Sequence, residues 1–208
     1  MAAHQRRVFG HAAGLHGVHL IVLNVGGGAS RVIPATFKGW DQHILDIDPA
    51  VNPDVCCDAK DMQKLKRGSY DAIYCSHNLE HFYRHDVPTV LAGFQHVLKP
   101  SGFAQIAVPD IQALMAEVVA GGNDIEDTWY SSPGGRISFH DVLYGWNQAM
   151  QSGNLFYAHK CGFTEKSLGK ALRAAGFKSV HIARDGMNLH AYAFKTTPNE
   201  AARKRLGL

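Results

Sequence analysis

The chain has 208 residues, of which 46% are hydrophobic and 19% are charged. This composition supplies enough apolar side chains for a sizeable core and excludes an intrinsically disordered chain. The formal net charge of +3 is too small to indicate binding to DNA or RNA, so we expect no nucleic acid partner.

The first predicted strand leads directly into three consecutive glycines. Residues 1–17 have no clear periodicity and are predicted to form an N-terminal arm, whereas residues 18–208 are predicted to form one domain. Residues 20–25 form a run that is almost entirely apolar, typical of a strand buried on both faces, and Gly26, Gly27 and Gly28 follow it. Glycine lets the backbone approach a ligand closely, so this turn is a candidate binding loop.

Strands and helices alternate through the first half of the chain. We expect further strands at 42–49, 54–58, 70–75 and 103–108, helical turns at 60–66, and a helix over 86–98. Ser30 is a candidate cap for a short helix before Pro34. This alternation predicts a doubly wound, mostly parallel α/β sheet with helices on both faces.

The second half contains an insertion that a minimal α/β fold does not need. Helices are predicted over 111–120, 138–151 and 164–175, the last capped by Thr164. The segments 177–183 and 189–195 are predicted to form an antiparallel pair, and 200–208 a solvated helical end. Long insertions are often lids or substrate loops, so residues 121–163 are predicted to lie on the acceptor side.

The cysteines and the apolar pattern predict a cytoplasmic protein. The four cysteines have no C-x-x-C spacing, which is typical of buried thiols in a reducing compartment. No apolar stretch approaches membrane-spanning length, and residues 1–17 lack the apolar segment of a signal peptide. We therefore expect no membrane partner.

Polar residues follow successive strands, at ends that meet on one edge of a parallel sheet. Asp46 lies 20 positions after Gly26, the spacing at which a carboxylate can accept hydrogen bonds from a ribose diol. Asp58 follows the next strand and can accept a hydrogen bond from the amine of an adenine base. Each aspartate alone can equally be a turn or cap residue, but the two together beside a glycine turn favour a nucleoside pocket.

These motifs, in this order, resemble the class I S-adenosylmethionine-dependent methyltransferases. The segment Val22–Ser30 is similar to the first motif of the family, and Leu45–Asp48 is similar to its acidic second-strand motif. The sequences Leu-Glu-His at 79–81 and Leu-Lys-Pro-Ser-Gly at 98–102 also match segments of the family. The resemblance implies a seven-stranded sheet whose last strand is antiparallel, S-adenosylmethionine as cofactor and S-adenosylhomocysteine as product.

The resemblance also implies which residues bind the cofactor. By position these are Asn24, Gly26, Gly27, Gly28, Asp46, Ile47, Asp58, Ala59, Ser76 and His77. Asn24 stands where the family often carries an acidic residue, and Ser30 replaces the last glycine of the loop. Both departures concern the methionine end of the cofactor more than its adenosine end.

The predicted activity is methyl transfer to a small or medium-sized acceptor by in-line displacement. Two alternatives remain open at this point: a non-catalytic protein that binds the cofactor or its product, and an aminopropyl transferase of the same fold. A nicotinamide cofactor is disfavoured because Arg31 stands where the third glycine of the dinucleotide fingerprint belongs.

Candidates for the acceptor side are His81, Asp110, His140 and His159, although the sequence alone assigns no catalytic residue. For Asp110, a cap of the helix that follows is the favoured interpretation. His77, His81 and His85 have the spacing of one helical face, but we identify no carboxylate or thiol nearby that completes a ligand set, so no metal is predicted.

Overall fold

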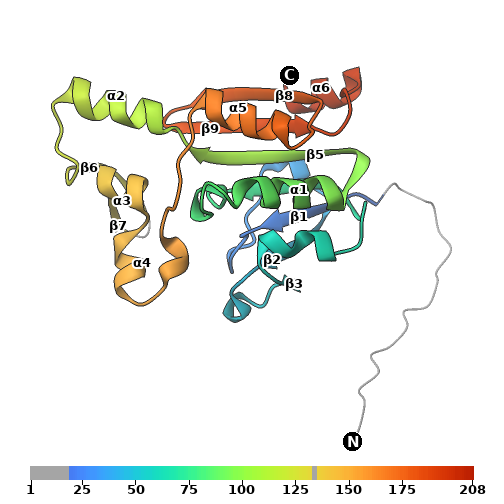
Figure 1. Cartoon of the computed structure of the whole chain (residues 1–208), viewed down its shortest axis with the longest axis horizontal. Coiled ribbons are helices and arrows are strands. Elements are labelled where there is room, and N and C mark those ends of the chain that lie inside the picture. Colours follow the sequence, from blue (N-terminus) through green and yellow to red (C-terminus); the bar gives the residue numbers. More distant parts are fainter. Residues whose placement is uncertain (1–18, 133–134) are drawn as a thin grey trace, which may run out of the picture.

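The computed structural model describes residues 19–132 and 135–208, and the predicted arm at 1–17 lies outside them (Figure 1). Its main feature is a seven-stranded sheet with strand order β3-β2-β1-β4-β5-β9-β8. The strands are β1 (Ile21–Val25), β2 (Asp41–Asp46), β3 (Val55–Cys56), β4 (Tyr70–Ser76), β5 (Leu98–Pro109), β8 (Ser179–Asp185) and β9 (Asn188–Phe194).

The sheet confirms the predicted fold class. β1 to β5 pair in parallel, whereas β9 pairs antiparallel with both β5 and β8. The last strand of the chain is therefore the antiparallel one, and β1 and β4 are central. Because β1 to β5 point the same way, their carboxyl ends meet at one edge of the sheet, where ligands of such folds bind.

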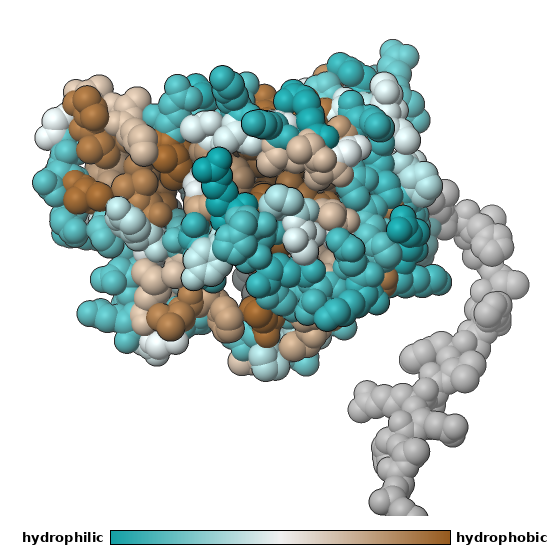
Figure 2. Space-filling model, viewed as in Figure 1, coloured by the Kyte–Doolittle hydropathy of each residue, from teal (hydrophilic) through white to brown (hydrophobic). Residues whose placement is uncertain are grey.

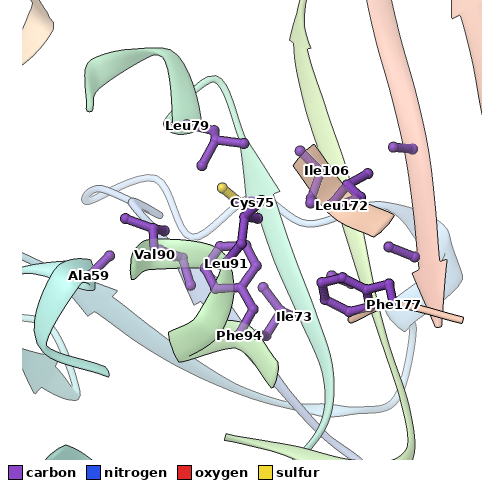
Figure 3. Close-up of a cluster of buried hydrophobic side chains, with 14 of the residues drawn as sticks. Ala59, Ile73, Cys75, Leu79, Val90, Leu91, Phe94, Ile106, Leu172 and Phe177 are labelled. Carbon is purple, nitrogen blue, oxygen red and sulfur yellow. The ribbon is translucent and has the colours of Figure 1, made fainter. Parts of the chain in front are cut away.

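One face of the sheet is covered by α1 (Val87–Val97), α5 (Glu165–Ala174) and the 3-10 helix η3 (Ala59–Lys64). Figure 3 shows Val90, Leu91 and Phe94 of α1 gathered around Ile73 and Cys75 of β4. Leu172 of α5 and Phe177 pack beside the same strands. This is the main core, and it holds β1 and β4 rigidly below the site.

The other face has a thinner, aromatic cover. The 3-10 helix η1 (Ala35–Phe37) and the terminal helix α6 (Glu200–Leu206) pack there against Val22, Ala72 and Phe103. The guanidinium of Arg205 lies 5.2 Å from the ring centroid of Trp40. The expectation of a solvated tail therefore needs correction, since Leu206 is buried in this second core.

The insertion lies beyond the carboxyl end of β5 (Figure 1). It follows α2 (Ile111–Gly121) and contains β6 (Thr128–Ser132), β7 (Gly135–Ser138), α3 (Phe139–Tyr144), α4 (Asn147–Gln151) and η5 (Leu155–Tyr157). Leu114, Phe139 and Val142 form its own small core. Figure 2 shows hydrophobic residues gathered over α2, where Met115 and Val119 are exposed.

Several predicted elements differ from the structure. The single helix expected over 138–151 is two helices, because Gly145 has a φ of 101° and breaks the helical backbone. The β6–β7 hairpin was not predicted, since its sequence is mostly polar. No helix begins at Ser30. The backbone turns at Arg31, which has a φ of 53°, and the next helical segment is η1 after Pro34.

The remaining differences are smaller. The turns predicted at 60–66 and the short strand at 54–58 correspond to η3 and to the two-residue strand β3. Asp48 and Asn52 flank a short 3-10 helix, η2 (Pro49–Val51), and η4 (Leu79–His81) follows β4. Cys75 is buried as expected, but Cys56 is exposed. Within the described residues no helix combines the length and apolar character needed to span a membrane.

Replacing Phe94 with alanine is expected to lower the free energy of unfolding by about 3–5 kcal/mol, because it opens a cavity between α1 and β4. The measurement is equilibrium unfolding in urea. Val119→Ala is the control, since this side chain is 82% exposed and its loss should change stability by less than about 0.5 kcal/mol. Equal effects of the two changes would contradict the assignment of the core.

Candidate functional site

The glycine loop after β1 is held in place by its neighbours. The Gly26 N–H donates to the Leu45 carbonyl at 2.8 Å, which ties the loop to the end of β2. Gly26 has a φ of 70°, and a Cβ at this position would overlap the side-chain amide of Asn78. The loop therefore needs glycine here both for its backbone conformation and for the Asn78 side chain that packs on it.

Asp46 joins the glycine loop to the turn after β2. One of its carboxylate oxygens accepts from the Gly28 N–H at 3.1 Å and the other from the Asp48 N–H at 3.0 Å. Each carboxylate oxygen can accept two hydrogen bonds, so one position on each remains for the hydroxyls of a ligand. Asp46 thus fixes the shape of the loop and presents acceptors at the sheet edge.

Asp58 begins η3 and belongs to a small charge cluster. Its carboxylate accepts from the Lys60 N–H at 2.9 Å and therefore caps the helix. The Lys60 ammonium lies 3.6 Å from the carboxylates of both Asp58 and Asp86. These two negative charges raise the pKa of Lys60, and Asp58 has the larger effect. Asp58 is therefore a helix cap, one of the two roles that the sequence allowed. It also lines the cavity described next, so it can contact a ligand as well.

A first cavity of about 150 Å³ lies between these strand ends. It brings together five of the predicted cofactor residues, which are Gly26, Asp46, Ile47, Asp58 and Ala59. The opposite wall comes from Phe82, Tyr83, Phe156 and Lys160. Carboxylates beside exposed apolar side chains are the surroundings that a ribose and an adenine base require.

The other predicted cofactor residues lie elsewhere. Asn24 is 2% exposed and packs beneath Gly27, so it supports the loop from below. Gly27, Gly28 and Ser76 are outside the walls of the first cavity, and His77 lines a second one. His77 has a φ of 47°, which turns the chain sharply after β4 and brings Asn78 to the cavity in its place.

Asn78 was not predicted from the sequence, and its amide oxygen is a useful probe of the site. This atom is buried and has no hydrogen-bond partner in the described structure, and the same is true of the side-chain nitrogen of Asn24 below the loop. An unpaired buried acceptor is costly unless a donor reaches it. Asn78 belongs to the polar segment that follows the fourth predicted strand, but Ser76 and His77 were predicted to bind the cofactor instead, because the left-handed backbone of His77 cannot be read from the sequence.

A second cavity of about 600 Å³ lies between the insertion and the sheet edge. The insertion contributes Trp129, Tyr130, Trp146, Tyr157 and His159 to its walls. The sheet side contributes His77, Pro109, Met187 and Asn188. His81 lines both cavities, so the two lie side by side with one imidazole between them.

His81 and His159 are brought together although they lie 78 positions apart in the sequence. Their ring centroids are 4.8 Å apart. The contact depends on the chain around Lys160, whose N–H, like that of Cys161, donates to the Glu80 carbonyl. Burial lowers the pKa of His159 and raises the pKa of Cys161 to about 11, so both side chains are held neutral near pH 7.

The other two acceptor-side candidates have different surroundings. Asp110 is fully buried, accepts from the Gln112 and Ala113 N–H groups at the start of α2, and pairs with Arg184 at 2.8 Å. The helix-cap interpretation of Asp110 therefore holds. His140 packs against Tyr144 with ring centroids 4.8 Å apart and lines neither cavity.

The residues present fit a nucleoside cofactor whose other end carries a charged amino acid. The first cavity alone is smaller than the roughly 300–1,000 Å³ of most ligand pockets, and together with its neighbour it enters that range. Asp46 and Asp58 lie on the walls of the first cavity, and the unpaired Asn78 oxygen can accept from an ammonium group. Fold and site together define a Rossmann-like domain that binds an adenosine-containing cofactor.

Comparison with known proteins gives the family. A family model described as "Methyltransferase domain" matches residues 17–182. The chain therefore belongs to the methyltransferase domain family; it is a class I enzyme, and its cofactor is S-adenosylmethionine. A search of the curated proteins gave no match.

Solved structures share the fold at low sequence identity. A SAM-dependent methyltransferase from Archaeoglobus fulgidus is 15% identical with a TM-score of 0.56, over 86% of this chain and 87% of that one. One from Aquifex aeolicus is 16% identical with a TM-score of 0.53, over 86% and 85%. A protein from Thermotoga maritima described as a possible histamine N-methyltransferase is 13% identical with a TM-score of 0.53, over 84% and 82%.

Changing Asp46 to asparagine is expected to weaken S-adenosylmethionine binding about 10- to 100-fold, because charged hydrogen bonds contribute about 1.5–3 kcal/mol each. The amide also cannot accept from both the Gly28 and the Asp48 N–H groups. Titration calorimetry measures the change. Asp48→Asn is the control: Asp48 caps η2 outside the cavity, and its change should leave affinity within about twofold of the native value.

Proposed function

We propose that this enzyme transfers the methyl group of S-adenosylmethionine to a small or medium-sized acceptor by in-line displacement. The adenosine end of the cofactor occupies the first cavity, its sulfonium end reaches the boundary with the second, and the acceptor occupies the second. The family match favours methyl transfer over aminopropyl transfer, and it favours an enzyme over a non-catalytic binding protein.

The observation that carries this proposal is the pair of neighbouring cavities that share His81. A displacement in line requires donor and acceptor to approach each other through one opening, which two adjacent cavities provide. The insertion contributes five aromatic or imidazole rings to the second cavity, and the carboxylates of Asp141 and Asp185 also line it. A cavity of about 600 Å³ suits a small molecule, which supports the assignment of residues 121–163 to the acceptor side.

The residues of the chain contribute mainly binding and orientation. S-adenosylmethionine carries the methyl group on a positively charged sulfonium sulfur. When the methyl group is transferred, S-adenosylhomocysteine departs as a good leaving group. Asp46, Ile47, Asp58 and Ala59 hold its adenosine end, and Asn78 accepts from its ammonium. Gly27 and Gly28 let the backbone approach, Asn24 supports them from beneath, and Ser76 and His77 carry the chain from β4 to Asn78. Positioning of this kind lowers barriers by up to about 7–11 kcal/mol in ideal cases.

The test combines cofactor binding with product release. Titration calorimetry should show one S-adenosylmethionine per chain. Its decarboxylated form should bind more weakly, since tighter binding of that form would favour the aminopropyl transferase alternative. S-adenosylhomocysteine release should then be measured across hydroxylated, aminated and thiol-bearing small molecules. Binding without release for every acceptor class of this size would overturn the assignment of the second cavity.

A further inference from the structure

Glu80 is a buried carboxylate that the proposed methyl transfer leaves without a role. Its side chain is 1% exposed, and neither oxygen has a hydrogen-bond partner in the described structure. The nearest cationic candidate is His77, whose Nδ1 lies 3.4 Å from one Glu80 oxygen. An ionised carboxylate in such surroundings is expensive unless a positive charge accompanies it.

Two imidazoles face this carboxylate, and both are oriented by backbone carbonyls. Nδ1 of His81 lies 3.1 Å from the Ala158 carbonyl oxygen, and Nδ1 of His159 lies 2.9 Å from that of Val142. A carbonyl can only accept, so each Nδ1 carries the proton and each Nε2 keeps a free lone pair. An imidazole fixed through one nitrogen in this way is the usual arrangement of a metal-ligating histidine.

The three side chains already converge. One ligand atom of each of Glu80, His81 and His159 lies within 4.8 Å of those of the other two. Tetrahedral zinc with bonds of about 2.0–2.2 Å holds its ligands about 3.3–3.6 Å apart, so side-chain rotations that bring the widest pair roughly 1 Å closer complete the set. Two histidines and one carboxylate are a ligand set for zinc and for other divalent transition ions.

We infer that Glu80, His81 and His159 bind a divalent transition-metal ion at the boundary between the two cavities, and that this ion is Zn²⁺. Three protein ligands leave coordination positions toward the second cavity, which His81 and His159 line. An acceptor with a hydroxyl or carboxylate oxygen fits such a position, a consequence that rests on the proposed function. The site also explains why a carboxylate without hydrogen bonds is retained beside two oriented imidazoles.

The experiment measures Zn²⁺ binding to the full chain after removal of metals by chelation. A competing chelator suppresses weak binding to other histidines, and the native chain is expected to hold one tightly bound Zn²⁺. Glu80→Gln and His159→Gln should each lower the Zn²⁺ affinity at least about tenfold. Mutation of residues that only hydrogen-bond to a metal ligand already lowers metal affinity roughly 10- to 100-fold. Circular dichroism and thermal unfolding establish that each variant is folded.

Two control variants distinguish this site from chance binding. His85→Ala removes a histidine that is 80% exposed and pairs with Asp86, and Cys161→Ser removes the thiol closest in sequence to His159. Both should keep the tight site. No tight Zn²⁺ in the native chain, or unchanged affinity in both ligand variants, would overturn the metal site.

S-adenosylmethionine titration of the same metal-free protein separates this inference from the proposed function. If the cofactor binds and Zn²⁺ does not, only the metal site fails. If Zn²⁺ binds and the cofactor does not, the metal site stands and the assignment of the first cavity fails.

Discussion

Replacing Gly26 with alanine is expected to weaken S-adenosylmethionine binding by at least about 100-fold, equivalent to roughly 2.7 kcal/mol. The left-handed backbone at this position costs alanine roughly 1–2 kcal/mol. In addition, the new methyl group overlaps the Asn78 side chain, which must then move within the cofactor cavity that it lines. Titration calorimetry on the folded variant measures the loss.

Gly28→Ala is the matched control for this change. Gly28 also has a left-handed backbone, with a φ of 55°, but a Cβ there meets no atom within 4 Å. Its N–H, which donates to Asp46, is retained in alanine. The control therefore carries the same backbone strain without the collision, and equal loss of affinity in both variants would show that Asn78 has no part in the cavity.

Replacing Gly145 with alanine is expected to lower kcat/KM for methyl transfer at least about 100-fold, with a smaller loss of affinity for S-adenosylmethionine because Phe156 of η5 also lines the first cavity. Gly145 has a φ of 101° where the chain passes between α3 and α4, and a Cβ there would overlap the Tyr157 carbonyl. The change must separate α3 from η5 and distort the second cavity, which Val142 and Tyr157 line.

The matched control is Gly153→Ala. Gly153 lies in the same insertion with a φ of 96°, but an added methyl group there would meet no atom within 4 Å. Steady-state kinetics with the acceptor found in the product-release assay compares the two variants. A parallel loss of cofactor affinity and turnover in Gly145→Ala would contradict the division into a cofactor half and an acceptor half.

The sheet could be predicted because its information is local. Buried strands such as β1 and β4 consist almost entirely of apolar residues, and each ends in glycine or a polar turn. The topology then follows from general rules, because parallel strands joined by crossovers place their carboxyl ends together. Asp46 and Asp58 therefore reach one cavity, as the spacing of the motifs predicted.

The parts that could not be predicted depend on long-range contacts or on single backbone angles. His159 meets His81 only because the chain after η5 donates hydrogen bonds back to Glu80, and no local pattern encodes that return. The three histidines His77, His81 and His85 do not share a helical face, because η4 spans only Leu79–His81. The carboxylate that completes the cluster is Glu80, adjacent to His81 in the sequence.

The insertion has a small core of its own, built around Leu114, Phe139 and Val142 and separate from the two cores that stabilise the sheet. Side chains of the insertion that line only the second cavity can therefore be exchanged without a direct effect on Asp46, Asp58 or the glycine loop. Under the proposed function, such exchanges would change which acceptor is methylated while the methyl donor stays the same. The aromatic residues Trp129 and Trp146 are where that divergence should be sought first.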